Sequence, residues 1–116
     1  MFDVMIKESD PKFVSFELDV LWAVHPGADP AKLLRTYGSR FKLMHVKDLK
    51  KGVKGDFSGK TDVRNDVILG TGQVDFSSLI KALPKSSIEH LYIEDESPDA
   101  SKQVPVSLEF LRKSLK

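Results

Sequence analysis

The chain has 116 residues, of which 41% are hydrophobic and 30% are charged, and its formal net charge is +1. This length predicts one domain, and the balanced charge gives no reason to expect nucleic acid or an acidic membrane as a partner. The sequence contains no cysteine, which excludes disulfides, thiolate metal sites and cysteine nucleophiles. No apolar run approaches the ~18 residues of a membrane span and residues 1–10 do not resemble a signal peptide, so we expect a cytoplasmic protein.

The first predicted elements are a short helix and three strands. Residues 1–9 have the apolar spacing of the tail of a helix. Runs rich in β-branched and aromatic residues predict strands over residues 13–20, 41–46 and 90–93. Residues 49–74 contain no clear period and are rich in Gly, Lys and Asp, so we expect a long functional or mobile connection there.

Helical patterns lie between and after the strands. Asp29 followed by Pro30 predicts the start of one helix, and Gly38 lies where a C-terminal glycine is expected. Asp75 predicts the start of a second helix, which Pro84 ends. The third helix is expected to begin near Pro105, with an apolar stripe of Val104, Leu108, Leu111 and Leu115. Strands that alternate with helices predict an α/β fold with a parallel sheet.

The predicted strands have one apolar face and one polar face. One face is apolar on all three strands and is expected to pack against helices; its residues are Val14, Phe16, Leu18, Met44, Val46, Leu91 and Ile93. The opposite face carries Glu17 and Asp19 on the first strand, with ionisable residues at the ends of the other two. A parallel sheet covered on both faces would be almost continuously hydrophobic, so this pattern favours the lumen of a barrel with its active site at the strand ends.

Three of these strand-end residues form a plausible ligand set. Asp19, His45 and Glu94 offer two carboxylates and an imidazole, which suit Mn²⁺, Zn²⁺, Co²⁺ or Mg²⁺. The alternative is a solvated polar face, because a surface histidine with nearby carboxylates is common without a metal. For Glu17, which lies one layer deeper, an ion pair with a neighbour such as Lys47 is the favoured interpretation.

Five segments resemble, in order, the motifs of a known family. They are FELDVLW (16–22), HPGADPAKLL (25–34), RFKLMHVKD (40–48), LGTGQVDF (69–76) and YIEDE (92–96). Together they are similar to the sugar-phosphate isomerase/epimerase family of xylose-isomerase-like TIM barrels. The resemblance implies that residues 1–116 form a single partial barrel domain: the last three β/α units, with parallel strands, helices on one face and the N-terminal strands absent.

The resemblance also implies a reaction and a set of roles. Family members bind a divalent metal and move a proton alpha to a carbonyl through an enediolate. By this resemblance Asp19, His45 and Glu94 are the metal ligands and Glu94 is also a catalytic acid/base. Trp22 and Lys47 would contact the substrate, a small sugar or sugar phosphate.

One expected residue has no counterpart in this chain. The family's fourth metal ligand, which is also the partner base, is a Glu on the preceding strand. An isolated three-stranded unit is expected to bind metal weakly, to catalyse slowly or not at all and to self-associate through its open edges. The alternative function is therefore an inactive fragment, or a half-barrel completed by a partner chain or by a missing N-terminal half, in which an export signal could also lie.

A second class of enzyme from the same superfamily, the clustered-zinc DNA endonucleases, fits the sequence poorly. Such a site needs more histidine ligands, and only one of the three histidines in this chain, His45, is at a lumen-facing strand end.

Overall fold

The computed structural model describes residues 2–116, and its helices and strands alternate along the chain. In order they are α1 (Phe2–Glu8), β1 (Phe16–Asp19), α2 (Val20–Val24), α3 (Pro30–Tyr37), η1 (Gly38–Arg40), β2 (Phe41–Val46), η2 (Val63–Asn65), α4 (Phe76–Ala82), η3 (Leu83–Lys85), β3 (His90–Ile93) and α5 (Ala100–Ser114). No helix among residues 2–116 has the length and apolar content needed to cross a membrane.

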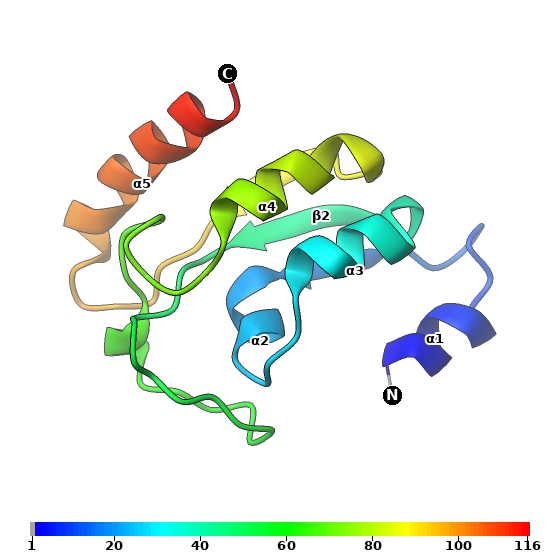
Figure 1. The fold of residues 1–116 in the computed structure, drawn as a ribbon, viewed down its shortest axis with the longest axis horizontal. Helices are drawn as coiled ribbons and strands as arrows, with labels where there is room; N and C mark the ends of the chain where they lie inside the picture. The colour runs from blue at the N-terminus through cyan, green and yellow to red at the C-terminus, as the bar shows by residue number, and fades with distance from the viewer. Residues whose placement is uncertain (1) are drawn as a thin grey trace.

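The three strands form one parallel sheet in the order β1-β2-β3. Asp19 pairs with His45, and His45 in turn pairs with Tyr92, so the strands end at the same rim. Helices α3 and α4 lie side by side along β2 in Figure 1, and α5 lies beyond α4. The predicted α/β arrangement of a partial barrel is therefore confirmed.

The apolar face of the sheet forms the core with these helices. Leu18, Met44 and Val46 are almost fully buried, and they contact Leu34 of α3 and Leu79 of α4 within one cluster. Burial of such side chains is the main stabilising contribution to the fold, at roughly 1.5–3 kcal/mol each. Val14 was expected on this face, but it precedes β1 and is 37% exposed.

Helix α1 closes one end of this core, as the pattern in residues 1–9 predicts. The Phe2 ring packs edge-on against Phe16 at a centroid distance of 5.5 Å and stacks on Phe41 at 5.8 Å. Arg40 donates from Nη1 to the carbonyl oxygen of Ile6 at 2.6 Å, which ties the end of α1 to the start of β2. Met1 lies outside the described residues.

Two predicted boundaries are wrong. The strand expected over 13–20 is limited to Phe16–Asp19, because Asp19 already caps a helix that begins at Val20. Helix α5 begins at Ala100 rather than near Pro105, which lies inside the helix. Its buried residues are Ser107 and Leu111, whereas Leu108 and Leu115 of the predicted stripe are exposed.

The long connection is irregular, as expected, but an aspartate anchors its far end. Asp48 is buried and its carboxylate accepts hydrogen bonds from the backbone N–H groups of Leu49, Gly70, Gly72 and Val74, at 2.8–3.1 Å. An isolated antiparallel bridge between Leu49 and Asp66 fixes the middle of the segment. The sequence motif at Gly70 to Gly72 is therefore a turn around a buried carboxylate.

Candidate metal centre

The strand register brings Asp19 and His45 together at the rim of the sheet. Asp19 ends β1, and its Oδ1 atom accepts a hydrogen bond from the backbone N–H of Trp22 at 3.0 Å. The other oxygen, Oδ2, lies 3.6 Å from Nδ1 of His45. The hydrogen bond that caps α2 thus fixes the Asp19 carboxylate, and its other oxygen faces the imidazole of His45.

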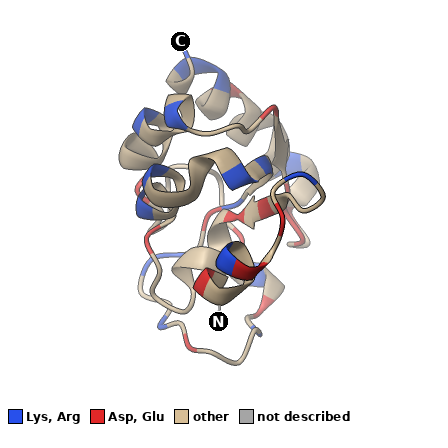
Figure 2. Ribbon diagram, turned by 90° about the vertical axis from the view of Figure 1, so that its right-hand side faces the viewer, with Lys and Arg blue, Asp and Glu red and all other residues tan. Residues whose placement is uncertain are grey.

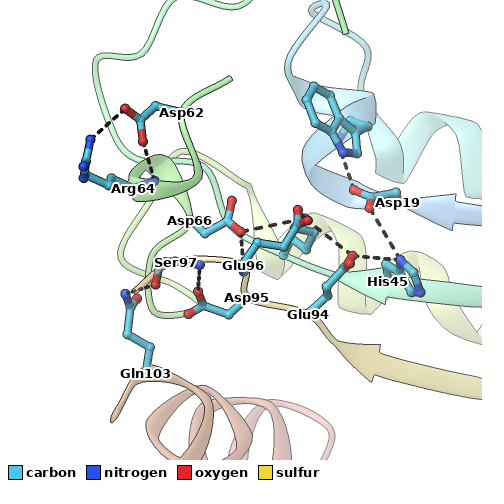
Figure 3. Close-up of polar contacts among 12 residues, drawn as sticks. Asp19, His45, Asp62, Arg64, Asp66, Glu94, Asp95, Glu96, Ser97 and Gln103 are labelled. Atoms are coloured by element: carbon cyan, nitrogen blue, oxygen red, sulfur yellow. Dashed lines mark hydrogen bonds and ion pairs between the residues drawn. The ribbon is translucent and has the colours of Figure 1, made fainter. Parts of the chain in front are cut away.

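Glu94 approaches the same nitrogen from the opposite side. It directly follows β3, and its backbone N–H donates to the carbonyl oxygen of Val46 at 3.3 Å, which continues the parallel pairing. Its Oε2 atom lies 2.9 Å from Nδ1 of His45. Figure 3 shows Asp19 and Glu94 directed at His45 from the two flanking strands.

The three candidate ligands therefore converge. One ligand atom from each of Asp19, His45 and Glu94 lies within 4.8 Å of the others, and all three residues are half-buried. A divalent ion can be held by two carboxylate oxygens and one imidazole nitrogen, so the donor set fits Mn²⁺, Zn²⁺, Co²⁺ or Mg²⁺. Their role as ligands stays a prediction.

The second imidazole nitrogen has its own carboxylate partner. Nε2 of His45 lies 2.9 Å from Oε1 of Glu17, which lies on the same face of β1 as Asp19. Glu17 therefore pairs with a neighbour, as predicted, but this neighbour is His45 and not Lys47, the example named above. A carboxylate on the far nitrogen orients the ring and fixes its tautomer, the arrangement that metal-binding histidines commonly have.

Lys47 lies next to Glu94, in a cluster of acidic side chains. Its buried Nζ atom donates to Oε2 of Glu96 at 2.8 Å, and lies 3.5 Å from Oε2 of Glu94 and 3.7 Å from Oδ2 of Asp66. Burial lowers the pKa of Lys47, but the hydrogen bond to Glu96 and the charges of Asp66 and nearby carboxylates outweigh it, so its pKa lies above the usual value. Lys47 is therefore a fixed positive charge beside Glu94.

Asp66 is the residue of this cluster that sequence patterns do not reveal. It comes from the long connection, is almost fully buried, and its Oδ2 atom accepts a hydrogen bond from the backbone N–H of Glu96 at 2.8 Å. Burial raises the pKa of Asp66, and the Glu96 hydrogen bond and the Lys47 charge oppose that rise. The only sequence signal was the length of the connection, since loops of that length are usually functional or mobile.

The two predicted substrate-binding residues lie on different sides of the centre. Trp22 lines an open groove of about 400 Å³ beside β1, together with Glu17, Asp19 and a largely apolar wall. Lys47 faces the acidic cluster. Contact of either residue with a substrate stays a prediction.

Not every ionisable residue at the strand ends faces the centre. Asp48 turns away to hold the loop, and Asp95 accepts a hydrogen bond from the backbone N–H of Ser97 at 2.8 Å. In Figure 2 the acidic segments mark the strands near the middle of the molecule, and much of the Lys and Arg lies on the surrounding helices. The rim is therefore an acidic surface with Lys47 and His45 embedded in it.

Comparison with known proteins gives relatives of a consistent kind. No protein-family profile matches the sequence. The chain is similar to the inosose dehydratase of Clostridium tetani, with 26% identity over 111 residues that cover 90% of this chain and 37% of that protein. It is also similar to the inosose dehydratase of Lacticaseibacillus casei, with 27% identity over 110 residues, 89% of this chain and 37% of that protein.

Solved structures agree with these relatives. The fold matches a sugar phosphate isomerase/epimerase from Parabacteroides distasonis with a TM-score of 0.74 and 26% identity, over 99% of this chain and 37% of that one. It also matches the IolI protein with a bound zinc atom, with a TM-score of 0.66 over 88% of this chain and 37% of that one, where the 18% identity shows a shared fold alone.

The chain covers only part of the length of these proteins. It spans 37% of the length of the proteins that it matches, and the sheet formed by residues 2–116 has three strands, whereas a complete TIM barrel has eight. Its strand order, the alternation with helices and its relatives agree with the motifs in the sequence. The chain is therefore similar, over 37% of their length, to inosose dehydratases and to a sugar phosphate isomerase/epimerase, as the resemblance of its motifs to xylose-isomerase-like TIM barrels predicts.

Proposed function

We propose that Asp19, His45 and Glu94 bind a divalent metal ion in a site for a small sugar or sugar phosphate. The observation that carries this proposal is the convergence of the three ligand atoms within 4.8 Å. The zinc atom bound to the IolI protein supports a metal in this fold. Nδ1 is the metal-binding nitrogen of His45, because it faces both Asp19 and Glu94 while Nε2 faces Glu17.

The proposed reaction is an isomerisation or epimerisation that begins with proton transfer alpha to a carbonyl. When bound, the ion would stabilise negative charge that develops on the substrate oxygens. Glu94 would move the proton, since one of its oxygens faces His45 and a carboxylate has a second oxygen to offer. The dehydratase relatives favour the same first step, because loss of water from a polyhydroxy ketone also begins with removal of an alpha proton.

Trp22 and Lys47 would position the substrate in this proposal. Trp22 borders the groove that opens beside Asp19, where an indole face can pack against the apolar side of a sugar ring. Lys47 provides a positive charge that does not depend on the ion and lies 3.5 Å from Glu94. Its ammonium would donate to a substrate oxygen.

A second candidate is a unit that becomes active only within a larger assembly. The outer edges of β1 and β3 have no strand partner among residues 2–116, and exposed parallel edges are sites of further pairing. Additional strands, from a longer polypeptide or from a separate chain, would supply a second base and cover the polar face. Alternatively, two copies of this chain would associate through the same strand edges.

Metal titration tests the proposal directly. We expect one Mn²⁺ or Zn²⁺ per chain, measured by calorimetry after treatment with a chelator, and loss of this binding in His45→Ala. His90→Ala is the matched control, because His90 is an exposed histidine on the neighbouring strand and outside the ligand set. Absence of binding to the folded wild-type chain would contradict the proposed function.

A second experiment addresses the reaction. Incubation of the metal-loaded chain with an inosose or a ketose in D₂O should introduce deuterium alpha to the carbonyl, as measured by proton NMR. Glu94→Gln should remove this exchange, because an amide cannot accept the proton. Exchange that is equally fast in Glu94→Gln would exclude Glu94 as the base.

A further inference from the structure

Asp66 and Lys47 form a buried ion pair directly behind the candidate metal centre. Lys47 Nζ lies 3.7 Å from Oδ2 of Asp66, and both side chains are at most 5% exposed. A buried ammonium loses its hydration, so its position is set by the carboxylates that replace the water. Three carboxylates surround this nitrogen, from Asp66, Glu94 and Glu96.

The three carboxylates differ in what else they contact. Glu94 Oε2 also faces His45 Nδ1 at 2.9 Å, which makes it the oxygen that a metal ion would need. Asp66 Oδ2 instead accepts the backbone N–H of Glu96. That hydrogen bond brings Asp66 and Glu96 together, and Figure 3 shows both on the side of Glu94 that lies away from His45.

The backbone around Asp66 is fixed independently of Lys47. Its neighbours pair with the segment after β2, with Lys50 N–H donating to the carbonyl of Asn65 at 2.9 Å and Val67 N–H donating to the carbonyl of Asp48 at 3.2 Å. The backbone of the long connection therefore fixes the buried carboxylate of Asp66 beside Lys47. An ammonium and a metal ion would compete for Glu94, so a carboxylate that holds the ammonium elsewhere favours the metal.

We infer that Asp66 is a positioning residue, which with Glu96 keeps the Lys47 ammonium from closing its 3.5 Å separation from Glu94 to a hydrogen bond, and so leaves Oε2 of Glu94 available to a divalent cation. The predicted effect on metal affinity rests on the proposed function, whereas the predicted position of Lys47 does not. The placement of Lys47 itself can be measured without a metal.

Mn²⁺ affinity measured by EPR in the full chain tests the consequence. Asp66→Asn keeps the shape of the side chain but removes its charge, so Lys47 shifts toward Glu94 and Mn²⁺ binds about tenfold more weakly, within the usual range for coupled neighbours. Asp62→Asn is the matched control, because it is the same change in the same connection at an exposed carboxylate that pairs with Arg64. It should leave the affinity unchanged.

A rescue variant separates an effect that acts through Lys47 from a general loss of structure. In Lys47→Met/Asp66→Asn the competing ammonium is gone, and neither partner is left buried without the other. This double variant should bind Mn²⁺ at least as tightly as wild type, and therefore about tenfold more tightly than Asp66→Asn. If the double variant binds as weakly as Asp66→Asn, Asp66 does not act through Lys47 and the inference is overturned.

The placement of Lys47 has its own readout. The Nζ resonance of Lys47, identified in ¹⁵N spectra by its absence from the double variant, should show slow hydrogen exchange in wild type. Exchange should become several-fold faster in Asp66→Asn and stay slow in Asp62→Asn. Unchanged exchange in Asp66→Asn overturns the inference, while a wild type that protects Lys47 but binds no Mn²⁺ contradicts the proposed function instead.

Discussion

Oδ2 of Asp19 lies 3.6 Å from Nδ1 of His45, while the other oxygen of the same carboxylate caps helix α2 through the backbone N–H of Trp22. One side chain thus has a structural role and a proposed metal-binding role on different oxygens. The register of β1 and β2 makes this possible, since Asp19 and His45 are direct partners.

Two substitutions at Asp19 separate these roles. Asn caps helices about as well as Asp, so the metal-free Asp19→Asn chain should be at least as stable as wild type but should bind Mn²⁺ at least about tenfold more weakly, because a ligand charge is lost. Asp19→Ala should lose the cap as well and be about 1 kcal/mol less stable than Asp19→Asn. Urea unfolding and calorimetry measure the two effects, and equal stability of the two variants would contradict the capping role.

Asp19 also makes stability depend on pH. Burial raises its pKa, and this effect exceeds the opposing effects of the Trp22 hydrogen bond and the charge of Lys47. The folded chain therefore holds the Asp19 proton more tightly than the unfolded chain, so this residue's contribution to stability falls as pH rises from about 4, the unfolded value, through the raised folded value.

The measurement is urea unfolding of wild type and Asp19→Asn with a chelator present. The stability advantage of Asp19→Asn should be larger at pH 7 than near pH 3, where both folded and unfolded wild type carry the proton. An advantage that does not change with pH would show that the Asp19 carboxylate is not destabilised by burial.

The sequence predicted elements well where one period covers the whole segment. Strand β2, at Phe41–Val46, matches the predicted bounds, and its residues alternate between half-buried and buried from Leu43 to Val46. At Asp19 the same residue ends a strand and caps a helix, so the strand pattern ran past the true boundary. Near Pro105 the rule that proline favours the first turn misplaced the start of α5.

The candidate ligands were accessible to sequence reasoning, and their supporting residues were not. Parallel strands align their ends, so three polar strand ends imply one rim. Asp66, in contrast, reaches Lys47 through a segment without regular structure, whose path is set by the bridge to Leu49 and by Asp48. No periodicity encodes such a path, and only the folded backbone reveals it.

At Gly38, substitution by Ala should destabilise the chain, although Gly→Ala usually stabilises a helix. Its φ of −53° and ψ of −35° are ordinary helical values, for which Gly→Ala usually stabilises by about 0.4–1 kcal/mol. However, a Cβ atom there would lie 2.5 Å from the carbonyl oxygen of Lys85 and 2.9 Å from Cα of Ser86. The predicted C-terminal glycine is therefore needed for close approach of two segments.

Gly38→Ala should destabilise the chain by about 1–3 kcal/mol, as overpacking against backbone usually does. Ser39→Ala is the control at the adjacent exposed position, and its effect should stay within about 0.5 kcal/mol. Urea midpoints of the two variants provide the comparison. A Gly38→Ala chain as stable as wild type would mean that η3 can move away without cost.

Asp48 holds the two ends of the long connection together. Its carboxylate accepts four backbone hydrogen bonds, from Leu49, Gly70, Gly72 and Val74. Gly72 also has to be glycine, because a Cβ atom would lie 2.3 Å from Oδ1 of Asp48 and from the Leu49 carbonyl. Removal of the carboxylate leaves buried N–H groups without an acceptor, each of which costs about 1–3 kcal/mol.

Asp48→Ala should therefore lose about 3 kcal/mol or more, and hydrogen exchange at Gly70 and Gly72 should accelerate far more than exchange in β2. Asp75→Asn is a suitable control, because Asn can keep the cap that Asp75 provides to α4 at an exposed site. Since the same connection carries Asp66, Mn²⁺ binding should weaken in Asp48→Ala even though Asp48 does not face the metal centre. If Mn²⁺ affinity survives while Gly70 and Gly72 lose protection, the part of the connection held by Asp48 moves independently of the bridge that fixes Asp66.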